Sequence, residues 1–170
     1  MTGSPDQLAL EISRQETFTV LEKQVGWKTI RRHRTRYPRY TIDSFDSACD
    51  FLVKILEESP VEMLYVIGLD SSNRFLGCTR LASGTVDRAA VYPRLLVSFL
   101  LSTNSSAVIV AHNHPGGRPE FSLEDISLTR RLTEILKPLD IRLLDHILYV
   151  PGEANAPGQW MSMTKEGVID

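Results

Sequence analysis

The chain has 170 residues, enough for one domain with its own hydrophobic core. Its 42% hydrophobic and 24% charged residues are ordinary values for a globular protein, and the net charge of −2 gives the whole chain no bias toward nucleic acid or membranes. Two cysteines, Cys49 and Cys78, are too few for a disulfide framework, which fits a reducing compartment. We interpret both as small core residues.

No targeting segment is expected. The first residues lack a basic stretch followed by an apolar run, so they predict no signal peptide. The longest apolar run, residues 90–101, is interrupted by Pro93, Arg94 and Ser98 and is too short to cross a bilayer. We therefore expect a soluble cytoplasmic protein with no membrane partner.

Residues 1–40 are interpreted as an N-terminal arm that contains a basic strand, and residues 41–170 as the globular domain. Residues 25–40 hold six basic and no acidic side chains. With the aromatic residues among them, they are suited to tracking a phosphate backbone while bases stack. The alternative is a twisted strand whose basic face meets only solvent. The candidate nucleic-acid contacts are Arg31, Arg32, Arg34 and Arg36.

In the domain, segments of helical period alternate with short apolar runs. An apolar stripe over residues 48–56 follows Asp43 or Ser44, either a suitable N-cap. Two apolar runs that flank a turn cluster predict a β-hairpin. This alternation predicts an α/β protein with a mixed sheet covered by helices. The later elements are expected at 62–70, 74–82, from Pro93, at 107–114, from Ser122 to before Pro138, at 141–150 and at 159–163.

The residues best suited to chemistry cluster between 112 and 125. His112 and His114 are two apart at the end of a predicted strand, so both imidazoles face the same side. Asp125 follows in the first turn of the next helix, after a Pro-Gly-Gly segment that allows a tight reversal. Three such donors match a catalytic zinc site with an open fourth position. The structural alternative is that Asp125 only completes a capping box with Ser122.

This pattern resembles a known family. The spacing His112-x-His114-Pro115, then Ser122 and Asp125, is similar to the JAMM (MPN+) metalloprotease signature. The wider segment HNHPGGRPEFSLEDISLTRRL resembles the RadC-like branch of that superfamily, and the resemblance covers about residues 40–165. This sequence departs from the family at two positions: it has Gly116 in place of the usual Ser and Phe121 in place of the usual Pro. Neither is a ligand position, and Phe121 can pack at the mouth of the site.

The resemblance implies a three-layer α-β-α sandwich of the JAMM/MPN, cytidine-deaminase-like type. It also implies one zinc ion per chain, bound by His112, His114 and Asp125. Glu62, which opens an apolar strand, stands where these enzymes have a catalytic Glu that takes a proton from the attacking water. The alternative for Glu62 is a solvated residue at the start of a strand.

Three further roles follow from the resemblance. Ser122 would offer its hydroxyl to the developing oxyanion, although it is also a plain N-cap candidate. Asp145 and His146, from the family-like Leu-Asp-His run, would support the metal ligands. The alternative for this pair is a buried polar contact unrelated to zinc.

The donor pattern predicts a zinc-dependent hydrolase, and the resemblance implies that it is of metallopeptidase or isopeptidase type and acts on a peptide or protein substrate. The main alternative is a non-catalytic module that keeps its metal site and binds DNA through the basic arm, because RadC-like proteins are traditionally labelled DNA repair proteins. The residues before the domain are too few for the helix-hairpin-helix module of full-length relatives. Deaminase chemistry would need paired cysteine ligands, which are missing from this sequence.

Overall fold

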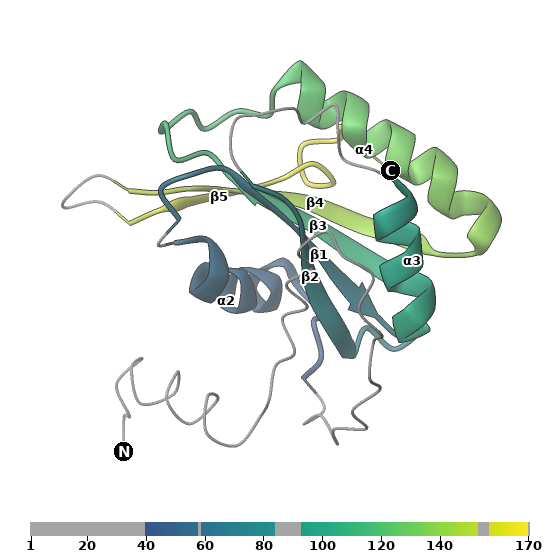
Figure 1. Ribbon diagram of the computed structural model, residues 1–170. Helices are drawn as coiled ribbons and strands as arrows, with labels where there is room; N and C mark the ends of the chain where they lie inside the picture. Colours follow the sequence, from purple (N-terminus) through teal and green to yellow (C-terminus); the bar gives the residue numbers. More distant parts are fainter. Residues whose placement is uncertain (1–39, 58, 84–92, 153–156, 170) are drawn as a thin grey trace, which may run out of the picture.

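The structure is a computed structural model that describes residues 40–57, 59–83, 93–152 and 157–169 (Figure 1). The basic strand expected within residues 25–40 lies outside the described residues except for Tyr40. The described elements occur in the predicted order and within a few residues of the predicted positions. They are α2 (Phe45–Leu56), β1 (Met63–Leu69), β2 (Phe75–Ser83), α3 (Pro93–Thr103), β3 (Ala107–Asn113), α4 (Leu123–Leu136), the 3-10 turn η2 (Lys137–Leu139), β4 (Arg142–Val150) and β5 (Gln159–Ser162).

The five strands form one mixed sheet in the order β2-β1-β3-β4-β5. The pairs β1–β2, β1–β3 and β4–β5 are antiparallel, and β3–β4 is parallel. Parallel neighbours need a crossover, and here α4 supplies it between β3 and β4. This confirms the mixed sheet with covering helices that the sequence predicts.

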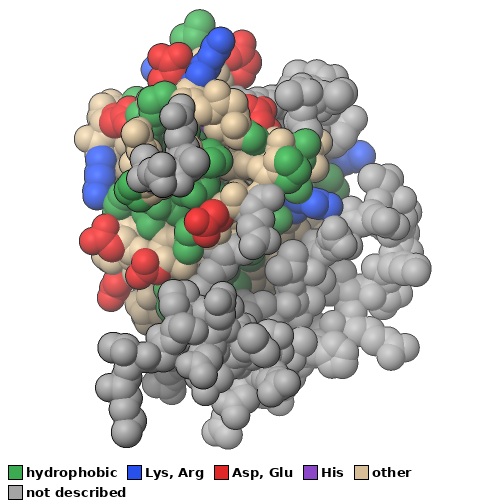
Figure 2. Space-filling model, turned by 90° about the vertical axis from the view of Figure 1, so that its left-hand side faces the viewer, with side chains coloured by type: hydrophobic (Ala, Val, Ile, Leu, Met, Phe, Trp, Pro, Cys, Tyr) green, Lys and Arg blue, Asp and Glu red, His purple; other side chains and the backbone are tan. Residues whose placement is uncertain are grey.

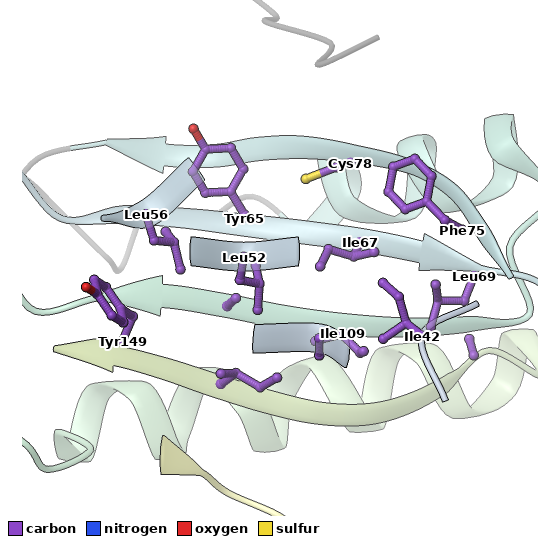
Figure 3. Close-up of a cluster of buried hydrophobic side chains, with 14 residues drawn as sticks. Ile42, Leu52, Leu56, Tyr65, Ile67, Leu69, Phe75, Cys78, Ile109 and Tyr149 are labelled. Carbon is purple, nitrogen blue, oxygen red and sulfur yellow. The ribbon is translucent and has the colours of Figure 1, made fainter. Parts of the chain in front are cut away.

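The helices lie on both faces of the sheet, which gives the three layers (Figure 1). Helix α2 packs on one face, where Leu52 and Leu56 are fully buried against side chains such as Ile67 and Ile109 (Figure 3). Helices α3 and α4 cover the other face, where the alternate residues of the strands point. Burying one Leu or Ile side chain stabilises the fold by about 1.5–3 kcal/mol. The buried hydrophobic cluster between the sheet and helices α3 and α4 comprises Leu64, Val66, Leu96, Phe99, Leu100, Val108, Val110, Leu128, Leu132, Leu136 and Ile141.

Capping residues fix where the helices begin. Ser44 is the N-cap of α2 and Ser122 the N-cap of α4, each with a complete capping box. Helix α3 begins at Pro93, a position where the missing N–H costs nothing. None of the helices in the described part of the chain is both long and apolar enough to pass through a membrane.

The topology brings the carboxyl end of the central strand, β3, close to the N-terminus of helix α4. The carboxyl end of β3 and the first turn of α4 are joined by residues 114–122, which include the Pro-Gly-Gly turn, and side chains from both elements meet there. Such carboxyl ends of strands are common ligand sites in α/β folds. Gly117 has φ +78 and donates its N–H to the carbonyl of His114, so this turn requires a glycine.

Candidate metal centre

Three predicted ligands meet at the junction of β3 and α4. His112 lies near the end of β3, His114 directly follows that strand, and Asp125 lies in the first turn of α4. Their exposed fractions are only 3%, 8% and 2%. Nε2 of His112 lies 3.0 Å from Nε2 of His114. Oδ2 of Asp125 lies 3.4 Å from the first nitrogen and 3.5 Å from the second. The three residues therefore form a buried group that could hold a metal ion.

The hydrogen bond of His114 determines which of its nitrogens faces the centre. Its Nδ1 lies 3.0 Å from the carbonyl oxygen of Arg118. A carbonyl oxygen only accepts, so Nδ1 must carry the proton. In the neutral ring, Nε2 then presents its lone pair to His112 and Asp125.

A longer chain of hydrogen bonds orients His112. The hydroxyl of Thr129 donates to the carbonyl oxygen of Asp125 at 2.6 Å, so Oγ1 must accept from Nδ1 of His146. Nε2 of His146 is then the acceptor for Nδ1 of His112, at 2.8 Å. The neutral His112 ring is left with its Nε2 lone pair toward the centre, as metal-bound histidines require.

The donor set fits a metal ion. Two imidazole lone pairs and a carboxylate oxygen converge within a buried space, which is unfavourable unless a positive charge lies among them. A proton on one imidazole supplies that charge, but a divalent cation bonds all three atoms at once. Burial raises the pKa of Asp125, whereas its contacts with His112, His114 and Ser122 lower it more strongly. The net pKa lies far below the ordinary value, so the carboxylate is ionised.

Ser122 holds the Asp125 carboxylate in place. Its backbone N–H and its hydroxyl both donate to Oδ2 of Asp125, at 2.9 and 2.6 Å. The Ser122 oxygen in turn accepts from the Asp125 N–H at 3.1 Å. The N-cap interpretation of Ser122 and the capping-box interpretation of Asp125 are both confirmed, and they are compatible with metal binding. The oxyanion role of Ser122 stays a prediction.

Glu62 lies beside the three ligands but is not one of them. It immediately precedes β1, the neighbour of β3 in the sheet. Its Oε1 is 4.0 Å from Nε2 of His114, and its side chain is 26% exposed. Glu62 therefore lies close to the buried His-His-Asp group without belonging to it, and its role as a general base stays a prediction.

The structure separates the two residues predicted to support the ligands. His146 contacts His112, as described above. Asp145 does not: its carboxylate accepts from the N–H groups of His146 and Thr164 and from the hydroxyl of Ser162. The expectation for Asp145 is therefore corrected, because adjacent residues of β4 face opposite sides of the sheet and only one of them can reach the ligands.

Two residues of the site were not found from the sequence. Thr129 lies one helical turn after Asp125, so the helical period could have placed it on the ligand side. Asn113, between the two histidines, bonds the segment that carries Glu62. No sequence pattern indicated that long-range contact.

The ring of Phe121 lies over the imidazoles, with centroid distances of 6.2 Å to His112 and 5.9 Å to His146. Phe121 thus packs beside the candidate site, while its expected place at the mouth of the site stays a prediction. Gly116 is exposed, and a Cβ there would meet nothing within 4 Å, so the usual Ser of the family would fit. Neither departure from the family pattern disturbs the ligands.

Not every sequence prediction can be placed relative to this group. Arg31, Arg32, Arg34 and Arg36 are outside the described residues, so their nucleic-acid role stays a prediction. Cys78 packs in the cluster under α2, and Cys49 lies half-buried on α2 itself. Neither thiol belongs to the His-His-Asp group, so these positions do not favour a deaminase-type zinc site.

A mixed α/β sandwich with a buried His-His-Asp group at a strand end is consistent with a JAB-type domain. The family model for the RadC-like JAB domain matches residues 42–168, which include Glu62 and all three candidate ligands. The chain belongs to the RadC-like JAB domain family.

Curated relatives agree with this assignment. The chain is 36% identical over 163 residues to a UPF0758 protein of Halorhodospira halophila, covering 96% of this chain and 63% of that protein. It is 38% identical over 128 residues to one of Alcanivorax borkumensis, covering 75% and 54%. A UPF0758 protein of Paracidovorax citrulli is 39% identical over 120 residues, covering 71% and 48%. The chain thus spans about half to three fifths of the length of these relatives.

Proposed function

We propose that this chain is a zinc-dependent hydrolase that cleaves amide bonds, of peptide or isopeptide type, in a peptide or protein substrate. The observation that carries the proposal is the convergence of His112, His114 and Asp125 on one buried point, with the Glu62 carboxylate 4.0 Å from His114. Two imidazoles and one carboxylate, with a fourth position open, are the donors typical of catalytic zinc.

A bound zinc ion would polarise the carbonyl of the scissile bond and lower the pKa of a water molecule toward neutrality. Glu62 is the general base: one of its carboxylate oxygens accepts a proton from the attacking water. The same oxygen then delivers that proton to the leaving nitrogen, which departs as an amine. The partial exposure of Glu62 supports this role, because the carboxylate reaches both the buried ligands and an incoming substrate.

Ser122 would assist at the carbonyl oxygen. In the free protein its hydroxyl proton is directed to Oδ2 of Asp125. The backbone N–H of Ser122 bonds the same oxygen, so that oxygen keeps a donor when the hydroxyl turns away. The freed O–H can then donate to the oxyanion that develops on the substrate.

The test is a hydrolysis screen with the zinc-loaded protein, using peptides and lysine-ε isopeptides as substrates. For any substrate that is cleaved, Glu62→Gln should lower kcat/KM by about 10²–10⁴ while zinc content stays unchanged. Asp145→Asn is the matched control, a carboxylate-to-amide change away from the ligands, and should leave the rate near wild type.

Cleavage that persists in Glu62→Gln would contradict the proposal. The alternative, a DNA-associated module with a retained metal site, predicts DNA binding that falls steeply with salt and survives both chelation and Glu62→Gln.

A further inference from the structure

We propose that Asn113 positions Glu62 at the metal centre, an inference that rests on the function proposed above. Asn113 stands between the two candidate histidine ligands at the end of β3, and its side chain has no exposed surface. Adjacent strand residues point to opposite faces. This strand end therefore carries ligands on one side and a buried amide on the other.

The Asn113 amide binds the backbone on both sides of Glu62. Its Oδ1 accepts from the N–H of Met63 at 2.8 Å. Its Nδ2 donates to the carbonyls of Ser59 and Val61, at 3.3 and 3.2 Å. The residues before and after Glu62 are thus held by one side chain, which lies about fifty positions further along the chain.

The β-ladder alone does not fix Glu62. On the side of β3 the last backbone pair joins Leu64 to His112, two residues from Glu62. On the side of β2 the ladder runs one residue further, to the pair of Met63 and Ser83, so Glu62 itself lies outside both ladders. Chain ends past a ladder fray readily. Where the backbone pairing with β3 stops, the Asn113 side chain bonds the segment with Glu62 instead, so this segment is attached to the strand that holds His112 and leads directly into His114.

This attachment matters because a general base must lie within hydrogen-bond reach of its proton. That reach is about 2.6–3.2 Å, and a misplacement of about 1 Å costs about 10²-fold in rate. Asn113 touches neither substrate nor reacting atoms, so it is a positioning residue. A merely structural Asn113 would lower stability when removed but would leave the Glu62 carboxylate in place.

The experiment compares zinc-loaded crystal structures and Co²⁺-substituted visible spectra of the wild type and Asn113→Ala. Asn113→Asp is an isosteric second variant that keeps the acceptor for Met63 and loses both donors; it decides the case if the alanine variant fails to fold. Ser105→Ala is the matched control. It removes a buried hydroxyl, bonded to Thr103, near the opposite end of β1.

In Asn113→Ala we expect the Glu62 carboxylate to move by about 1 Å or more or to spread over several positions, with the three ligands unmoved and the zinc Kd within about threefold of wild type. The Co²⁺ spectrum should match that of Glu62→Gln, and the double variant should add no further change. Ser105→Ala should match wild type in both measurements.

A Glu62 carboxylate that keeps its wild-type place in Asn113→Ala overturns the inference, whatever Glu62→Gln does. If Glu62→Gln instead leaves the spectrum and hydrolysis unchanged, the proposed function fails. Displacement of Glu62 in Asn113→Ala would then still support the positioning contact. The two failures are therefore distinguishable.

Discussion

Nδ1 of His112 lies 2.8 Å from Nε2 of His146, a fully buried histidine on the neighbouring strand β4. Thr129, also fully buried, lies on the far side of His146 and closes the chain onto the backbone of Asp125. Two of the three candidate ligands are thereby linked through residues that do not face the metal position. Such supporting contacts fix the tautomer and ring orientation of a metal-binding histidine.

Removing this support should weaken metal binding without removing a ligand. We expect His146→Leu to raise the zinc Kd by about 10–100-fold. Thr129→Val, which keeps the side-chain volume but removes the hydroxyl, should raise it by about 10-fold because His146 loses the acceptor for its Nδ1 proton. Competition titration with a zinc chelator measures both values.

The matched control for this prediction is Asp145→Asn. The Asp145 carboxylate accepts from the backbone N–H of His146 and bonds Ser162 and Thr164, but it contacts neither the His146 ring nor the candidate ligands. Its zinc Kd should stay within about twofold of wild type. An equal loss of affinity in all three variants would show that general destabilisation, rather than the His146 contact, is responsible.

Ser122 is expected to contribute to stability and activity separately. Ser122→Ala removes an N-cap and should lower the free energy of unfolding by about 0.5–2 kcal/mol, whereas Ser122→Gly should cost only a few tenths of a kcal/mol as a cap. Both lack the hydroxyl that would stabilise the oxyanion. If Ser122 acts in catalysis, kcat should fall by a similar factor in both, on the order of 10².

Urea unfolding and the hydrolysis assay separate the two roles. If Ser122→Gly has both wild-type kcat and near wild-type stability, while Ser122→Ala is lower in both, Ser122 acts only as the helix cap.

Both cysteines should be unreactive in the native protein. Burial raises the pKa of Cys78 to about 12. Burial and nearby acidic groups, Asp46 first among them, raise that of Cys49 to about 12 as well. Because the thiolate is the nucleophile and the ordinary pKa is 9.0, alkylation at pH 8 should be about 10³-fold slower than in the unfolded chain.

Mass spectrometry after iodoacetamide treatment, with and without guanidinium, measures this difference. Rapid stoichiometric labelling of the native chain would contradict the buried environment of Cys78 and the half-buried one of Cys49.

Much of the fold could be predicted because the hydrophobic period and the residues that begin and end helices indicate the same elements. Ser44 and Pro93 mark helix starts, and apolar runs mark the strands. The face of α3 shows the limit of this agreement: its apolar period groups Leu95 with Leu96, Phe99 and Leu100, yet Leu95 is half-buried while the other three are buried. Which apolar side chains of a helix become fully buried depends on how the layers pack, and the period along the sequence does not determine this.

The three candidate ligands could be proposed from their spacing together with the family resemblance; spacing alone left Asp125 equally explained as a capping-box residue. The supporting contacts could not, because they join distant segments. Asn113 bonds Met63 across 50 positions, and His146 meets Thr129 across 17. The alternation of β4 could, however, have shown that Asp145 and His146 cannot both face the ligands.

The central claim is that His112, His114 and Asp125 bind one zinc ion. The most direct measurement is the metal content of the desalted protein, by inductively coupled plasma mass spectrometry, for wild type, His114→Ala and Asp125→Ala. We predict one zinc per chain in the wild type and in Glu62→Gln, and less than about one tenth of that in the two ligand variants. Stoichiometric zinc in both ligand variants would contradict the claim.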